Sequence, residues 1–468
     1  MRVLLAVFAV VGGLALVQKY PCGETNWSNQ QVRYQKMCYS DVPYLYTGRG
    51  FAERRWPYGQ SDGRYPAMEY PVLISYFAWG AAEITGLMPS GPSLAIRAHT
   101  PTDALWGLPG MTKEVNTYFL VTAVLLLCCG LGSVFFLAGA SPGRPWDAMA
   151  FALSPTLLLS GLVNWDLIAV LFTAGALWAW ARGRPILAGV MVGLGTAAKL
   201  YPLFLLGAFA VHALYRGRGA GERRPHPEKL VLAVCGAATA WLAVNIPAIV
   251  SGLPDWKVFW TFNSHRAADL GSLWLVLQQN GFSASPHLIN VVSGVLFALA
   301  CAGIAVLGLR APRRPQVAQI GFLVVAAFLL VNKVYSPQYV LWLLPLAALA
   351  RPRWRDLLIW QAGELLYFGA VWLYLGGWLA PASGGDSPAY QLAILVRAAA
   401  ELYLMAMVVR DMLAPAAPFE EWADEPDDPW DEWDGEWDGS DDVDAVEGGR
   451  GVAHPDLDPV PDGRHVDV

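Results

Sequence analysis

The sequence predicts an all-α polytopic membrane protein, a bundle of about twelve transmembrane helices. The 468-residue chain is 55% hydrophobic with a mean hydropathy of +0.38, and only 15% of it is charged, against about 25% in typical soluble domains. Several apolar runs approach the roughly 20 residues that a helix needs to cross a bilayer. Arginines are concentrated in the short connectors between those runs, as expected on the cytoplasmic side of a membrane protein.

The first apolar run is Val3–Val17, preceded by Arg2. It has the short apolar region of a signal peptide, but no A-x-A cleavage pattern follows, so we interpret it as a transmembrane helix with a cytoplasmic N-terminus. The first external loop then covers residues 20–117. Within it, Tyr70–Met88 is long and apolar enough to cross, but a crossing would move every later basic connector outside. We therefore expect a non-spanning helix or hairpin at the outer interface.

The later spans follow from placing the short basic connectors in the cytoplasm. We expect spans at residues 118–138, 147–162, 166–181, 186–198, 201–215, 230–250, 287–309, 317–332, 339–350, 357–375 and 391–409. The pair 186–198 and 201–215 is too short for two comfortable crossings, which leaves open a broken or re-entrant pair. Both termini are then cytoplasmic.

Charge divides the chain into two parts. The stretch Phe419–Val468 holds 19 acidic and 2 basic residues, a net charge of −17, which leaves +11 on the remainder of a chain whose total is −6. We therefore expect a transmembrane domain at 1–413 and an acidic cytoplasmic tail at 414–468. The tail is rich in proline and acidic residues and cannot bury a core, so disorder is predicted, with binding of a cytoplasmic protein as its suggested role.

Cysteines are few. Cys22 and Cys38 flank the start of the first loop, where a disulfide and two free thiols are both open interpretations. The other four, in apolar spans, are expected to be small core residues: Cys128, Cys129, Cys235 and Cys301. No CxxC pair or Cys/His cluster is present, so we expect no metal site, although Asp41 with Asp166 could hold an ion.

Several motifs are missing from the sequence. It has no P-loop, no G-x-G-x-x-G after a strand, no H-E-x-x-H and no G-x-S-x-G. We therefore expect no soluble nucleotide chemistry, no cofactor and no nucleic-acid partner.

The first loop contains the strongest candidate for a catalytic base. Asp41 follows Cys-Tyr-Ser and precedes Val-Pro, and its carboxylate could accept the proton of an attacking hydroxyl. The alternative is that Asp41 caps a short helix. Asp62 and Glu69 are rival bases, of which Asp62 in Gln-Ser-Asp-Gly has the pattern of a turn residue. Acceptor or sugar binding is expected from the loop residues Tyr44, Glu69 and Tyr70.

Two polar groups interrupt the apolar spans. Asn164 and Asp166 lie at a junction of two spans, where they could bind sugar or acceptor, or where Asp166 could cap the following helix. Lys199 ends a run of small apolar residues and could hold a phosphate as a point charge. Alternatively, the Lys199 side chain extends toward the membrane interface and serves as a simple anchor.

Two further external segments carry basic residues on the side where such residues are disfavoured. Ser251–Pro286 contains His265 and Arg266, and Asn332–Tyr339 contains Lys333, Tyr335 and Gln338. Basic groups with tyrosine and glutamine donors suit a phosphate leaving group. For Lys333 alone, interface anchoring is the simpler interpretation. Under the predicted topology both segments face the same side as the first loop and Asn164.

A set of motifs resembles a known family. The stretches CYSDVPYLY, EYP, NWDLIAVLF, RPILAGVMVGLGTAAKLYPLFLL, HRAADLGSLW and KVYSPQYVLWLLPL look like the actinobacterial membrane glycosyltransferases of glycosyltransferase family 87, over about residues 1–410. The resemblance implies a GT-C-like helical bundle, a polyprenyl-phosphate sugar donor, inversion at the anomeric carbon, and a base in the first external loop, matching Asp41. The family's similarity to α-1,2-mannosyltransferases suggests mannose.

We therefore expect a hexosyltransferase of the plasma membrane whose active site faces outside and whose acceptor is a lipid or a cell-envelope glycan. A lipid or solute transporter is the first alternative, but it predicts inverted repeats and none is apparent. The second alternative is a non-catalytic scaffold that recruits partners through its tail, which would leave Asp41 and Lys333 without a role.

Overall fold

The computed structural model describes residues 1–60, 62–216, 225–380 and 386–414. All regular elements in these ranges are helical, which confirms the all-α prediction. The acidic tail expected at 414–468 lies outside the described residues from position 415 onward.

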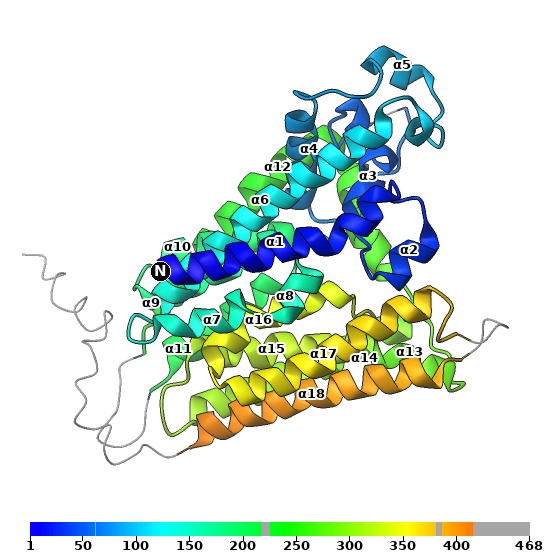
Figure 1. The fold of residues 1–468 in the computed structure, drawn as a ribbon. Coiled ribbons are helices and arrows are strands. Elements are labelled where there is room, and N and C mark those ends of the chain that lie inside the picture. Colours follow the sequence, from blue (N-terminus) through cyan, green and yellow to red (C-terminus); the bar gives the residue numbers. More distant parts are fainter. Residues whose placement is uncertain (61, 217–224, 381–385, 415–468) are drawn as a thin grey trace, which may run out of the picture. The chain divides into compact units, whose positions relative to one another are not determined.

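Six of the described helices are long and apolar enough to cross a bilayer. They are α1 (Arg2–Glu24), α6 (Met111–Ala140), α12 (Pro227–His265), α14 (Pro286–Arg310), α17 (Trp354–Leu375) and α18 (Pro388–Leu413). All six coincide with predicted spans, and each exceeds the roughly 20 residues that a crossing requires. The start of α1 and the last turn of α18 lie at the same end of the bundle (Figure 1).

Shorter apolar helices form the remainder of the bundle. They are α9 (Asp166–Ala181), α10 (Pro185–Ala198), α11 (Leu205–Leu214), α15 (Val317–Val331) and α16 (Val340–Ala350), with single 3-10 turns η4 (Tyr201–Phe204) and η6 (Pro337–Tyr339) before α11 and α16. A helix of about 15 residues is roughly 22 Å long, short of the roughly 30 Å hydrocarbon core. The pairs α10–α11 and α15–α16 therefore turn back within the bundle, at Lys199 and at residues 332–336.

The span expected at 147–162 does not exist as one helix. The chain instead forms η3 (Pro145–Ala148), α7 (Met149–Ala152) and α8 (Pro155–Ser160). Pro155 disfavours helical geometry at Ser154, and the Ser154 hydroxyl caps the new helix by accepting from the Leu157 amide at 3.3 Å. These short pieces lead to the Asn164 connector and then into α9.

Between α1 and α6 the chain forms a region of short helices. These are α2 (Gln30–Gln35), α3 (Val42–Gly48), η1 (Phe51–Glu53), α4 (Val72–Thr85), α5 (Leu94–His99) and η2 (Leu105–Gly107). The apolar segment expected at the outer interface is α4, whose 14 residues are too few for a crossing. It packs against α6, α10 and α12 (Figure 1).

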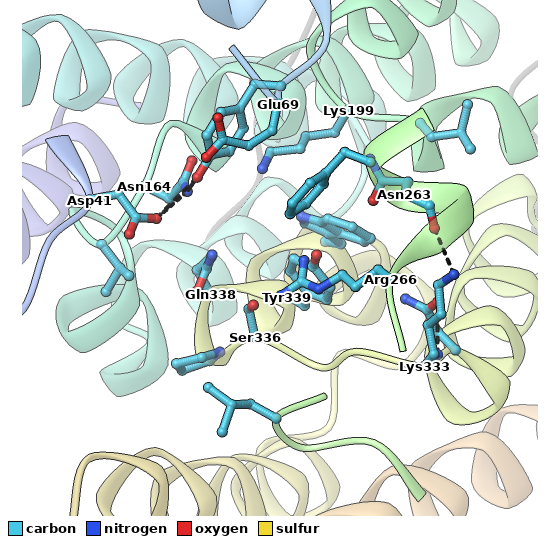
Figure 2. Close-up of a pocket in the computed structure, with 18 of the residues that line it drawn as sticks. Asp41, Glu69, Asn164, Lys199, Asn263, Arg266, Lys333, Ser336, Gln338 and Tyr339 are labelled. Atoms are coloured by element: carbon cyan, nitrogen blue, oxygen red, sulfur yellow. Dashed lines mark hydrogen bonds between the residues drawn. The ribbon is translucent and has the colours of Figure 1, made fainter. Parts of the chain in front are cut away.

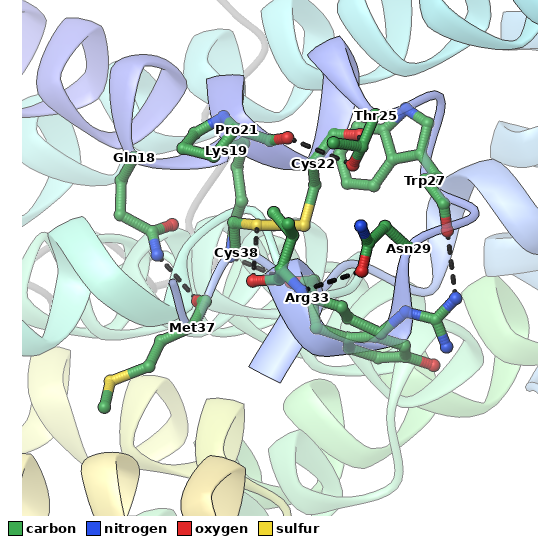
Figure 3. The surroundings of a disulfide bond; sticks show 12 residues. Gln18, Lys19, Pro21, Cys22, Thr25, Trp27, Asn29, Arg33, Met37 and Cys38 are labelled. Atoms are coloured by element: carbon green, nitrogen blue, oxygen red, sulfur yellow. Dashed lines mark hydrogen bonds between the residues drawn. A yellow bond between two sulfur atoms is a disulfide. The ribbon is translucent and has the colours of Figure 1, made fainter. Parts of the chain in front are cut away.

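A disulfide joins Cys22 at the end of α1 to Cys38, with Cα atoms 5.7 Å apart (Figure 3). It closes the short loop that contains α2. Gln18 and Lys19 of α1 also donate to the carbonyls of Met37 and Tyr39, at 2.6 and 2.9 Å. The chain just before Asp41 is therefore fixed to the end of α1, which settles the open question about these two cysteines.

Helix α12 changes direction at Gly252, where the backbone leaves helical geometry. A Cβ at this position would lie 2.2 Å from the backbone nitrogen of Gly59 in the first loop. Asp255 accepts hydrogen bonds from the amides of Gly59 and Gln60, at 2.7 and 3.3 Å. The first loop thus holds the outer part of α12, which ends at His265; α13 (Leu273–Gln279) follows before α14.

Candidate active site

The first loop, the helix connectors and the end of α12 meet at one cavity of about 810 Å³. Figure 2 shows Asp41, Asn164, Glu69 and Lys199 on one side and Arg266 and Lys333 on the other. These residues come from segments that the sequence predicted to share one face. Eight predicted site residues line the cavity: Asp41, Glu69, Tyr70, Asn164, Lys199, Arg266, Lys333 and Gln338.

Asp41 presents its carboxylate to the cavity and accepts three hydrogen bonds. Tyr39 Oη donates to Oδ1 at 2.6 Å, while Asn164 Nδ2 and Tyr70 Oη donate to Oδ2 at 2.6 and 3.2 Å. Burial raises the pKa of Asp41 above its ordinary value, against the lowering effect of the hydrogen bonds from Tyr39 and Asn164. A carboxylate with a raised pKa is a better proton acceptor, which suits a general base.

The alternative of Asp41 as a helix cap does not hold for its side chain. Asp41 precedes α3 but makes no capping hydrogen bond. The Ser40 hydroxyl instead accepts from the Val42 amide, at 3.4 Å. The carboxylate of Asp41 is therefore available to the cavity rather than bound to the backbone of α3.

Asp166 and Lys199 form an ion pair at the floor of the site. Their closest oxygen and nitrogen are 3.5 Å apart, and Trp342 Nε1 donates to Asp166 at 2.6 Å. Asp166 is fully buried and does not line the cavity, whereas Lys199 does. Lys199 is only 8% exposed and its ammonium lies 5.0 Å from the Tyr70 ring centroid, so it does not extend to an interface as a simple anchor. The partners of the Asp166 carboxylate are thus Trp342 and Lys199, side chains outside α9.

On the opposite side, Arg266 and Lys333 bring positive charge to the cavity. Arg266 Nη2 donates to Asp269 at 2.6 Å, and Lys333 Nζ donates to the carbonyl of Asn263 and to Oδ1 of Asn290, both at 2.6 Å. Burial lowers the pKa of Lys333, and the nearby charge of Arg266 adds to this effect. Arg266 points toward the middle of the cavity, near Tyr339 (Figure 2).

Four predicted site residues do not line the cavity. His265 is exposed and bonds back to the Thr261 carbonyl at 2.8 Å. Tyr335 is buried behind the wall, with its hydroxyl on Glu364, and Asp166 lies below the floor. Tyr44 lies one layer back, where its ring stacks on Tyr39 at 5.7 Å.

The rival bases have other partners. Asp62 accepts from the Arg64 amide at 3.2 Å and pairs with Arg55, as a turn residue would. Glu69 lines the cavity, but its two oxygens accept from Arg49 at 3.1 and 2.8 Å. Asp41 therefore has a carboxylate directed into the cavity without a cation bound to it.

An aromatic wall lies beside Asp41, and its residues Tyr34 and Trp372 were not predicted. It consists of Tyr34 and Tyr39 from the first loop and Trp372 from α17, with the Tyr39 and Trp372 rings 5.2 Å apart. Arg33 also lines the cavity, and its guanidinium lies 4.6 Å from the Tyr44 ring centroid. Trp372 gives no sequence signal because a tryptophan near a span end is typical of any membrane interface.

Among the described residues, no three His, Cys, Asp or Glu side chains gather as metal ligands would. Asp41 and Asp166, the pair considered for an ion, have separate partners: Tyr39, Tyr70 and Asn164 for the first, and Trp342 and Lys199 for the second.

In a comparison with known families, residues 105–332 match the model of glycosyltransferase family 87. This range runs from η2 to the end of α15 and contains Asn164, Lys199 and Arg266. Asp41 precedes it, so the role of Asp41 depends on the geometry described above. A search of curated proteins found no match.

Proposed function

We propose that this protein is a membrane glycosyltransferase of family 87, whose model matches residues 105–332, and that it transfers a hexose from a polyprenyl-phosphate donor. The family's similarity to α-1,2-mannosyltransferases suggests mannose as this hexose. The acceptor is a hydroxyl of a lipid or a cell-envelope glycan, and transfer inverts the anomeric carbon.

The observation that carries this proposal is one carboxylate, Asp41, facing a cavity whose opposite side is cationic. In the proposed reaction Asp41 takes the proton of the acceptor hydroxyl as its oxygen attacks the anomeric carbon. The new carbon–oxygen bond forms on one face of the sugar while the bond to the phosphate oxygen breaks on the other, so the configuration inverts. The electron pair leaves with the polyprenyl phosphate. A phosphate is a good leaving group, so no general acid is needed.

The donor phosphate is assigned to the side of Arg266. Guanidinium groups bind phosphate oxygens through paired, charge-assisted hydrogen bonds. Gln338 and Ser336 line the cavity between Asp41 and Arg266 and can add neutral donors, and Lys199 supplies a second positive charge from the side of Asp41. Lys333 is already bound by two oxygens, so its contribution is to the local positive potential and to the shape of the wall.

The lipid part of the donor fits the apolar lining contributed by the end of α12. Phe259, Trp260 and Phe262 line the cavity, as does Phe328 from α15, and the Arg266 guanidinium lies 5.6 Å from the Phe262 ring centroid. A charged site next to an apolar wall matches a phosphate attached to a prenyl chain. A nucleotide-linked donor would leave that apolar wall without an occupant.

The acceptor is assigned to the aromatic wall of Tyr34, Tyr39 and Trp372. A sugar or cyclitol ring has an apolar face of C–H groups, which packs favourably against aromatic rings. An acceptor ring placed there has its hydroxyls beside Asp41. This assignment replaces Tyr44, which lies behind Tyr39, while Tyr70 and Asn164 orient the base rather than the acceptor.

The disulfide supports an outer location for the site. Disulfides form and persist in oxidising compartments, and Cys38 of the Cys22–Cys38 disulfide is three residues before Asp41 in sequence. We accordingly propose a plasma-membrane enzyme with the cavity open to the outside and both termini in the cytoplasm.

The test is a transfer assay with the purified full-length protein. It is incubated with polyprenyl-phosphate-[14C]mannose and total membrane lipid, and labelled product is separated from donor. We expect product from the wild-type protein and very little from Asp41→Asn, with Asp62→Asn as the matched control at a surface turn. Absence of product with mannosyl, glucosyl and galactosyl donors alike would contradict the proposal.

A further inference from the structure

A cluster of buried side chains lies behind the cavity wall and has no part in the proposed chemistry. Tyr335 Oη donates to both carboxylate oxygens of Glu364, at 2.9 Å each. The guanidinium of Arg397 lies 3.6 Å from the Tyr335 ring centroid and donates to Glu401 at 2.8 Å. None of these four side chains is more than 3% exposed. Ionisable groups buried inside a membrane bundle are costly and usually mark a functional position.

The cluster is connected to the cationic side of the cavity through the backbone. The amide of Tyr335 donates to the carbonyl of Leu270, and the amide of Asp269 donates to the carbonyl of Lys333, both at 2.8 Å. The carboxylate of Asp269 in turn binds the guanidinium of Arg266 at 2.6 Å. Three contacts therefore lead from the buried Glu364, through Tyr335 and the backbone near Asp269, to the cation that faces the cavity.

Gly271 shows how closely these two segments are held. Its φ of +70° is favourable for glycine, and its amide donates to Tyr390 Oη at 3.0 Å. A Cβ at this position would lie 2.1 Å from Tyr367 Oη and 2.4 Å from the carbonyl oxygen of Tyr335. Tyr367 Oη itself donates to that carbonyl at 2.5 Å. Tyrosines of α17 and α18 thus fix both segments against the bundle.

We propose that Tyr335 and Glu364 are positioning residues for the donor phosphate. Neither touches a substrate; together they hold the backbone near Asp269 and so set where the Arg266 guanidinium lies. This inference rests on the proposed function, because it assigns the phosphate to Arg266. Asp41 is held by other elements, through Tyr39, Tyr70 and Asn164. Loss of the Tyr335 hydroxyl therefore weakens donor binding and leaves the chemical step unchanged.

The test compares Tyr335→Phe with Tyr374→Phe in the full-length protein. Tyr335→Phe removes one hydroxyl and keeps the ring beneath Arg397. Tyr374 is the matched control: it belongs to α17, as Glu364 does, and stacks on Tyr390 at 4.3 Å, while its hydroxyl accepts a 3.3 Å hydrogen bond from Gln279. Binding of sugar-free polyprenyl phosphate is measured from the shift in Tm that it causes, and donor KM and kcat are measured in the transfer assay.

We expect Tyr335→Phe to weaken lipid-phosphate binding and to raise donor KM about tenfold, the loss typical of one hydrogen bond to a charged group, with kcat within about twofold. Tyr374→Phe is expected to leave both constants unchanged. Glu364→Gln keeps an acceptor oxygen for Tyr335 and is expected to bind donor better than Glu364→Ala. If Tyr335→Phe does not fold, Tyr367→Phe takes its place in the test. This variant lacks the hydroxyl that donates to the Tyr335 carbonyl, and we expect it to raise the KM for the sugar donor as well.

Three results would overturn the inference: unchanged donor binding in a folded Tyr335→Phe protein, a fall in kcat at constant donor KM, or an equal effect of Tyr374→Phe. Failure of the proposed function is distinguishable, because then the wild-type protein itself would neither bind polyprenyl phosphate nor transfer sugar.

Discussion

Asp41 and Asn164 are 123 residues apart in sequence, yet Asn164 Nδ2 donates a 2.6 Å hydrogen bond to Asp41 Oδ2. The same amide group donates to Tyr70 Oη at 2.8 Å, and Tyr70 Oη donates to Asp41 at 3.2 Å. This triangle joins the first loop to the connector before α9. It fixes the orientation of the one carboxylate that we assign to proton transfer, and it is the basis of the predictions about activity.

Replacement of Asp41 by Asn should lower kcat by at least about 10²-fold, since general-base catalysis typically contributes about 10² to 10⁴. Asn has nearly the same size and retains one acceptor oxygen for the Asn164 and Tyr70 donors, while the Tyr39 hydroxyl can rotate to accept from the new amide, so the protein should fold. The measurement is steady-state transfer with Tm as the control for folding. Wild-type turnover in a folded variant would remove Asp41 from this role and favour Glu69.

Turnover should fall as the pH is lowered, because the base must be ionised to accept a proton. Burial raises the pKa of Asp41, so the acid limb should lie above the pH range in which an ordinary aspartate titrates. The pH dependence of kcat/KM in the free enzyme reports this group. Asn164→Ala, which removes a hydrogen bond to the ionised form, should move the limb to still higher pH. An acid limb that stays in place in Asn164→Ala would argue against Asp41 as the titrating base.

Removal of the Cys22–Cys38 disulfide should destabilise the first loop. A cross-link that closes a loop of about this size contributes about 3 kcal/mol in the chain-entropy model. We expect the double variant Cys22→Ser/Cys38→Ser to have a lower Tm in detergent and a raised acceptor KM, because the closed segment carries Tyr34. Cys128→Ser, at a free thiol of α6, is the matched control. Equal Tm values for the two variants would contradict this prediction.

Trp372→Ala should raise the KM for the acceptor more than the KM for the donor. Trp372 faces Tyr39 at the aromatic wall, whereas the donor phosphate is assigned to the distant side of the cavity near Arg266. Loss of one aromatic contact with a sugar ring corresponds to about 1 kcal/mol, or roughly fivefold in KM. Trp378→Ala, at an exposed tryptophan just after α17, serves as the control. If Trp372→Ala raised the KM for the donor and left the KM for the acceptor unchanged, our assignments of the donor and acceptor sites would have to be exchanged.

Membrane-impermeant thiol reagents should reach the first loop and residues 251–286 from outside the cell. Single cysteines placed at Asp62 and at Asn280 test the outer side, and one placed in 216–229 tests the inner side, in a variant without the four free thiols. The expectation comes from the distribution of arginines and from the location of the disulfide. Labelling of 216–229 from outside would invert the topology and move the cavity to the cytoplasmic face.

The helices were predictable wherever apolar residues alone decided them. The ranges expected at 166–181 and 287–309 differ by no more than one residue at either end from α9 and α14. The expected span at 147–162 failed because Ser154 and Pro155 interrupt an otherwise apolar run. An average of hydropathy over the segment does not reveal such a break, but the proline imposes it on the backbone geometry.

The site was predictable only in part. Asp41, Lys199, Arg266 and Lys333 were recognisable because a charged residue in or beside an apolar span needs a reason to be there. The same argument pointed to His265, and the expectation of neutral phosphate donors pointed to Tyr335. Both lie outside the cavity, because sequence position does not tell which way a side chain points. Trp372 had no such signal, since an aromatic residue is unremarkable in a span.

By itself, the sequence determined the helical membrane fold, the positions of the long apolar helices and the charged residues that had to be accommodated. Its determinants are local, because the hydrophobic length and the helix-breaking residues of each segment act within about twenty residues. Only the tertiary structure decided which carboxylate faces the cavity and what lies opposite it. Asp41 acquires its orientation from Asn164 and Tyr70, and Arg266 acquires its position from Tyr335 through Asp269. Such hydrogen bonds join residues far apart in sequence, and they exist only after the helices have packed.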